Sequence, residues 1–175
     1  VGIDGYLVDV EVDINNGLPG FETVGLPDSA VKESKERVKS AIKNSALDYP
    51  INKIIVNLAP ANTKKEGSLY DLSIAVGILY ATGQVEGNID DFIFLGELSL
   101  NGDLRKVNGL LPMLISARNQ GYKKIIIPKE NGKSRIAIVV DSLNDGVTLA
   151  GVPAVILLNF ALGYAIQAAP SFTVI

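Results

Sequence analysis

EGSLYDLSIAVGIL (Glu66–Leu79) is the stretch that decides the fold. A glycine turn and a serine precede a run of small apolar residues with almost no polar face. A helix that is apolar all round is usually buried on every side, so we expect residues 69–82 to form a central helix. The serine in front of this run is open to two interpretations, a helix cap and a nucleophile on a tight turn.

The helix-cap interpretation rests on the spacing Ser68-x-x-Asp71, which is typical of a capping box. We therefore predict that the Ser68 hydroxyl and the Asp71 carboxylate satisfy backbone N–H groups of the first turn. As a nucleophile, Ser68 would need a lysine as its base, because the chain has no histidine. The candidates are Lys64, Lys65 and Lys106, but all lie in polar sequence surroundings, where we expect a lysine to stay charged.

Strand and helix patterns follow one another on both sides of this central segment. Strand patterns occur at residues 8–14, 21–25, 51–58, 91–107 and 122–128, and helical patterns at 26–45 and 108–120. Asp28 or Ser29 can cap the first of these helices, and Asn101-Gly102 is a strong hairpin-turn signal. We predict one α+β domain with two or three helices packed on a mixed sheet.

Composition narrows the possible chemistry. The 175 residues are 47% apolar and 20% charged, with a net charge of −3, which fits a packed globular domain. The chain has no cysteine and no histidine, which excludes disulfides, thiolate catalysis and imidazole ligands to a metal. The first residues lack the basic and apolar regions of a signal peptide, so we expect a cytoplasmic protein.

A row of basic residues marks the helix predicted at residues 26–45. Lys32, Lys35, Lys39 and Lys43 recur at spacings of three and four, which places them on one face. Such a row can follow the phosphates of DNA and bind them without sequence preference. The alternative is a solvated face that Glu33 and Glu36 partly neutralise. No aromatic residue lies between the lysines, so a platform for base stacking is not indicated.

A second charged row lies in the strand pattern at residues 8–14. Asp9, Glu11 and Asp13 share one face of this strand. Three carboxylates could bind a hard cation such as Mg²⁺. Like charges in a row are also typical of the solvated face of an outer strand, where they discourage edge pairing. We expect the second role and no metal site.

The C-terminal part differs from the rest of the chain. Residues 146–175 contain no Asp, Glu, Lys or Arg, and residues 152–169 are about long enough to span a bilayer. Pro153, Asn159 and Gln167 weaken the membrane interpretation, and no basic residue flanks the segment. We expect a buried terminal strand and helix, with a membrane-associated segment and a tail foreign to the domain as the alternatives.

Two blocks of sequence resemble the proteolytic domain of Lon protease: KKEGSLYDLSIAVGIL (Lys64–Leu79) and FLGELSLNGDLRKVNGLLPMLISARNQGYKKIIIP (Phe94–Pro128). The resemblance implies a Lon-like fold, similar to the second domain of ribosomal protein S5. The catalytic serine of Lon aligns with Leu69, and its catalytic lysine aligns with Leu111. Neither leucine can attack a carbonyl or take a proton, so the resemblance implies a Lon-type domain without protease chemistry.

Three further blocks are similar to the amino-terminal domain of the Mg-chelatase-like ATPases, the ComM/YifB competence family. They are Asn16–Ser45, Ile51–Leu79 and Phe94–Arg105. In that family the domain precedes an AAA+ ATPase module, and the whole protein resembles a hexameric helicase that acts on DNA during natural transformation. The resemblance therefore implies DNA, the AAA+ module and neighbouring subunits of the ring as partners, and no small-molecule substrate.

The resemblance covers residues 1–130, which we predict to be the Lon-like domain, and it fades in the apolar residues 131–175. No G-x-x-x-x-G-K-[S/T] motif occurs in the chain. ATP and Mg²⁺ are therefore expected only for an AAA+ module that this sequence does not contain. Other interpretations are a Ser–Lys hydrolase that uses Ser68, and a membrane-associated module that uses residues 152–169.

Overall fold

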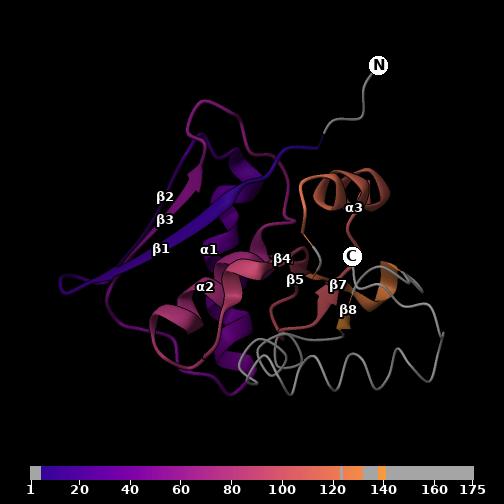
Figure 1. Cartoon of the computed structure of the whole chain (residues 1–175). Coiled ribbons are helices and arrows are strands. Elements are labelled where there is room, and N and C mark those ends of the chain that lie inside the picture. The colour runs from indigo at the N-terminus through magenta and orange to yellow at the C-terminus, as the bar shows by residue number, and fades with distance from the viewer. Residues whose placement is uncertain (1–4, 123, 132–137, 141–175) are drawn as a thin grey trace.

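The computed structural model describes residues 5–122, 124–131 and 138–140. The helices of this part of the chain are α1 (Ser29–Asn44), α2 (Asp71–Ala81) and α3 (Leu110–Asn119), with short 3₁₀ turns η1 (Ile89–Asp91) and η2 (Lys129–Asn131). Helix α2 lies in the middle, with the three-stranded sheet on one side and the remaining strands and α3 on the other (Figure 1). Helix α1 packs against α2. The predicted α+β class is confirmed for these residues.

The first sheet is mixed and has the strand order β1-β3-β2. Its strands are β1 (Asp9–Asn15), β2 (Gly20–Val24) and β3 (Lys53–Ala59). Strand β3 lies in the centre, antiparallel to β1 and parallel to β2. Its alternate residues Ile54, Val56 and Leu58 are fully buried, because every second side chain of a strand points to the same face.

Within the described residues, the other strands form two further small sheets and not the one mixed sheet that the sequence predicts. Strands β4 (Phe92–Phe94), β7 (Lys124–Pro128) and β8 (Ile138–Val140) are parallel, whereas β5 (Glu97–Leu98) and β6 (Leu104–Arg105) form the hairpin predicted around Asn101-Gly102. The break between β4 and β5 has a local cause. The Gly96 N–H donates to the Leu69 carbonyl, and the Gly96 carbonyl accepts from the Leu72 N–H, so this backbone binds the start of α2 instead of a strand.

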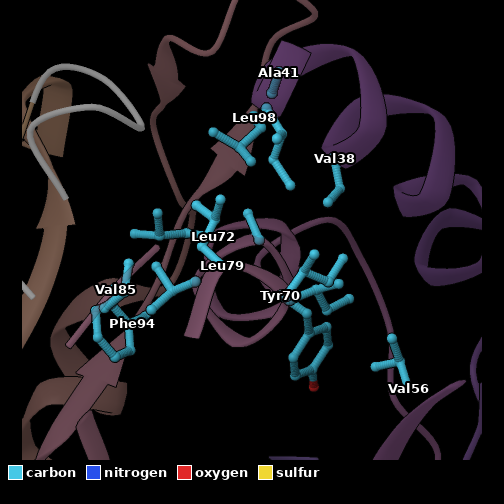
Figure 2. Packing of buried hydrophobic residues seen from close by; sticks show 14 of the residues in the cluster. Val38, Ala41, Val56, Tyr70, Leu72, Leu79, Val85, Phe94 and Leu98 are labelled. Carbon is cyan, nitrogen blue, oxygen red and sulfur yellow. The ribbon is translucent and has the colours of Figure 1, made fainter. Parts of the chain in front are cut away.

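Helix α2 is buried over most of its surface, as its sequence predicts, and only its last residues, Tyr80 and Ala81, are exposed. Leu72, Ile74, Ala75, Ile78 and Leu79 are fully buried, and they pack with residues of α1, β3 and β4 in one core (Figure 2). Each large aliphatic side chain removed from water contributes about 1.5–3 kcal/mol to folding. This core holds α1 against α2 with its lysine-rich face outward.

Ser34 of α1 is the buried polar side chain without a hydrogen-bond partner in the described structure. A buried unsatisfied hydroxyl costs about 1–3 kcal/mol relative to a satisfied one. We therefore expect Ser34→Ala to leave stability unchanged or to raise it by about 1 kcal/mol. Chemical denaturation of the two proteins measures this difference, and a clear loss of stability would mean that the hydroxyl has a partner.

The apolar segment at residues 146–175 lies outside the described residues, so neither the expected terminal strand and helix nor the alternatives can be placed. Among the helices that the structure does describe, none is both long and apolar enough to cross a membrane.

Candidate functional site

Helix α1 presents the four predicted lysines to solvent. Asp28 caps the helix, because its Oδ1 accepts a hydrogen bond of 2.7 Å from the Val31 N–H. One face is buried in the core and consists of Val31, Ser34, Val38, Ala41 and Ile42. The opposite face exposes Lys32, Lys35, Lys39 and Lys43. These four side chains are here called the lysine face.

Acidic neighbours neutralise little of the lysine face. Lys35 forms an ion pair with Glu36, but the two atoms are 3.9 Å apart and both side chains are largely exposed. The Glu33 carboxylate lies 3.9 Å from Nη1 of Arg37 and does not pair with a lysine of this face. Among the described residues, no ion pair involves the other three lysines. Exposed pairs of this length contribute little, so the face remains positive.

Tyr49 is an aromatic residue close to Glu36 of this helix, and it does not form a stacking platform. Its ring is partly buried against the main core. Burial, with a smaller effect of the Glu36 carboxylate, raises the pKa of Tyr49 to about 12. The phenol therefore stays neutral at physiological pH and adds no charge beside the lysine face.

The predicted capping box at the start of α2 is wrong. The helix begins at Asp71, and no side chain caps it. The Ser68 hydroxyl donates to Glu97 in β5 instead of binding the first turn. The Asp71 carboxylate turns away from the Ser68 N–H toward α1 and β5. Both side chains bind partners that are distant in sequence, which a local spacing rule does not consider.

Asp71 forms a buried ion pair with Arg37 of α1. The carboxylate is fully buried and accepts from Arg37 Nε at 2.6 Å, from Arg37 Nη2 at 3.1 Å and from the Leu98 N–H at 3.1 Å. Burial raises the pKa of Asp71, and the hydrogen bonds and charge of Arg37 oppose that effect. The hydrogen bond to Asp71 in turn raises the pKa of Arg37. This pair ties α1 to α2 and to the β5–β6 hairpin.

The surroundings of Ser68 do not resemble those of an activated nucleophile. Its hydroxyl binds a carboxylate, and Glu97 also lies 3.5 Å from Arg105. Lys64 pairs with Glu66 at 2.6 Å, and Lys106 is exposed. In the described part of the chain, no lysine forms a hydrogen bond with Ser68, so a Ser–Lys dyad has no base there.

Lys65 differs from the sequence prediction, which placed it in polar surroundings. Its side chain is fully buried and donates a hydrogen bond to the Pro60 carbonyl. Its backbone N–H donates to Leu26 and its carbonyl accepts from the Asp28 N–H, so the lysine fixes the loop before α2 against the start of α1. The ammonium group therefore supports the fold and does not reach Ser68.

The two positions that align with the Lon catalytic pair lie in different environments. Leu69 is partly buried and packs against both hydrophobic cores. Leu111 on α3 is 63% exposed. Neither side chain can act as a nucleophile or a base. Leu69 is a packing residue and Leu111 is a surface residue.

The acidic row of β1 is exposed. Glu11 accepts a hydrogen bond from Asn57 at 2.7 Å, and Asp13 accepts one from Asn15 at 2.8 Å. Within the described residues, no group of three or more acidic side chains is arranged to hold a metal ion.

Arg37 and Glu97 are structural residues that the sequence analysis did not single out, and Lys65 is one whose structural role it did not predict. Arg37 follows the buried Ser34 by three positions, which places it beside the apolar stripe of α1. This position is the sequence feature that could have indicated its structural role. Nothing in the local sequence of Lys65 or Glu97 distinguishes them from surface residues.

Comparison with known proteins identifies the family to which the sequence of this chain is similar. The family model for subunit ChlI of Mg-chelatase matches residues 10–131. The chain is 45% identical over 132 residues to the competence protein ComM of Haemophilus influenzae, and 46% identical over 132 residues to YifB of Escherichia coli. Each match covers 75% of this chain and 26% of the relative, so the chain spans about a quarter of the length of these relatives.

Lon proteases are more distant relatives. Lon protease 2 of Bacillus subtilis is 26% identical over 168 residues, which covers 85% of this chain and 28% of that protein. The match to the ChlI model covers more than half of the chain, and the ComM and YifB matches run through the same region. The chain therefore belongs to the ChlI/Mg-chelatase-like family, together with ComM and YifB.

Proposed function

We propose that this chain is a non-catalytic module of a larger Mg-chelatase-like AAA+ ATPase, and that its lysine face contacts DNA. The observation that supports the proposal is the exposed row of Lys32, Lys35, Lys39 and Lys43 on α1. The buried ion pair and the α2 core hold α1, which carries this row, against α2, and three of the four lysines have no carboxylate partner in the described structure. Phosphates of a nucleic acid are anions that such a row can follow.

Family membership supports the rest of what we propose. The domain at residues 1–130 has a Lon-like fold, similar to the second domain of ribosomal protein S5, with leucines at both catalytic positions. ATP and Mg²⁺ bind to an AAA+ module that lies outside this sequence, in a cytoplasmic protein that acts as a helicase. The name of the competence protein ComM supports a role in natural transformation, in which the module joins neighbouring subunits of a hexameric ring.

The test is a fluorescence-anisotropy titration of single-stranded and branched DNA across a salt series. Four substitutions on α1, K32Q/K35Q/K39Q/K43Q, are expected to weaken binding. They should also reduce the slope of log affinity against log salt by about 0.9 for each lost contact with duplex phosphate, or about 0.7 with single strands.

A matched control removes the same number of positive charges elsewhere. K53Q/K64Q/K106Q/R118Q changes exposed or partly exposed side chains on β3, the loops and α3. It should retain most of the affinity and most of the salt slope. Equal losses in the two variants, or unchanged binding by the α1 variant, would contradict a DNA contact through the lysine face.

A further inference from the structure

A cavity lies beside the first strand, on the side of β1 away from β3. It has a volume of about 580 Å³ and is bordered by β1, α2, β4 and α3. Its apolar walls include Val8, Val10, Val76 and Phe92. Figure 1 shows β1 on one side of α2 and the strand β4 with helix α3 on the other. The cavity is therefore a groove bordered by α2 and by the first half of β1, since Asp9, Val10 and Glu11 line it and the later residues of the strand do not.

Strand β1 is an edge strand with a free side. It pairs with β3 over all seven residues, and no other strand of the described structure pairs with it. An unpaired edge presents a row of backbone N–H and C=O groups that can bind another extended chain. Seven residues of strand are about 24 Å long, which is enough for a short peptide.

The inward face of β1 is incompletely covered. Val10, Val12 and Ile14 are only partly buried, although they pack against the main core. The corresponding residues of the central strand, Ile54 and Val56, are fully buried. An added strand next to β1 would cover this apolar surface with its alternate side chains, and those beside Val10 would enter the groove.

The outward face of β1 is acidic, which determines the charge that a neighbouring strand would need. Asp9, Glu11 and Asp13 are exposed, and in the described structure none of them forms an ion pair with a lysine or arginine. A second copy of β1 paired with this edge would place carboxylates next to carboxylates, which is destabilising. A strand with basic residues on the outward face would instead be attracted.

We propose that the free edge of β1 binds an extended segment of a partner protein in which basic and apolar residues alternate. The backbone of this segment extends the β1-β3-β2 sheet by one strand. Its apolar side chains enter the groove above α2, and its basic side chains lie beside Asp9, Glu11 and Asp13. The proposal is independent of DNA binding, because the lysine face is on α1.

The first test compares three labelled nine-residue peptides by fluorescence anisotropy. One alternates lysine and valine, one has the same composition in two blocks, and one alternates glutamate and valine. We expect the alternating lysine peptide to bind at least about ten-fold more tightly than the other two. Equal binding of the alternating and block peptides would show attraction by charge alone and would overturn strand addition.

The second test exchanges charges on the strand. D9K/D13K should weaken the binding of the alternating lysine peptide about ten-fold and strengthen the binding of the glutamate peptide. The control E86K/D103K has the same net charge at exposed sites away from β1 and should bind the peptides like the wild type. Circular dichroism establishes that both variants are folded. If the control and D9K/D13K respond alike, the acidic row is not the binding site.

The third test asks whether backbone hydrogen bonds form. In the alternating peptide, the N–H groups of all valines point to one edge of the strand and those of all lysines to the other. N-methylation of one set should therefore abolish binding, and methylation of the other set should leave it within about three-fold of the parent peptide. Retained binding by both methylated peptides would rule out pairing with β1.

Discussion

Replacing Arg37 with methionine is expected to lower the free energy of unfolding by about 3–5 kcal/mol, because it leaves a buried carboxylate without its cation. Asp71 is fully buried and receives two of its hydrogen bonds from Arg37. Methionine keeps most of the side-chain length, so the loss reports the missing charge more than a cavity. Denaturant unfolding of the two proteins measures the effect.

Two comparison variants make this prediction specific. Lys39→Met removes an exposed positive charge from the same helix and should change stability by less than about 0.5 kcal/mol. Arg37→Met/Asp71→Leu removes both charges, and an apolar pair should recover much of the lost stability. If Arg37→Met is as stable as Lys39→Met, the ion pair does not hold α1 to α2.

The stability that Arg37→Met loses relative to the wild type should depend on pH in a defined direction. Burial raises the pKa of Asp71, and Arg37 opposes this in the wild type. Without Arg37, the folded-state pKa lies further above the unfolded value of about 3.9. A raised folded pKa gives stability that is present below the unfolded pKa and lost as pH rises. The deficit of Arg37→Met should therefore shrink as the pH falls from 7 toward 4.

The second large effect is expected at Gly25, where Gly25→Ala should lower stability by about 2–5 kcal/mol. An added Cβ would lie 2.1 Å from the Leu58 carbonyl oxygen, and the backbone has φ of +97°, which disfavours any side chain. Leu58 belongs to the central strand and is fully buried, so its backbone has little room to move.

Gly83 provides the matched control for this substitution. It has φ of +72°, but no atom lies within 4 Å of the position of an added Cβ. Gly83→Ala therefore introduces only backbone strain, which costs about 1–2 kcal/mol. The difference between the two variants in thermal or chemical unfolding measures the clash with β3. Equal losses would mean that the β2–α1 turn and β3 separate easily.

Much of the architecture could be predicted from periodicity along the chain. The alternation of β1, the apolar run of α2, the lysine row of α1 and the Asn101-Gly102 turn each depend on neighbours within a few positions. The exposure of the four lysines follows in the same way, because the apolar stripe of α1 determines which face is buried.

The sequence by itself determined the central helix α2, the orientation of α1 and the β5–β6 hairpin, because local periodicity and turn chemistry specify them. The tertiary structure decided the rest: the division of the described strands into three sheets, the Arg37–Asp71 pair, the Ser68–Glu97 bond and the burial of Lys65. Arg37 and Asp71 are 34 positions apart, and Ser68 and Glu97 are 29 apart. A polar side chain forms a hydrogen bond with a group that the packed core brings within about 3 Å of it. The spacing of residues along the chain does not predict which group that is.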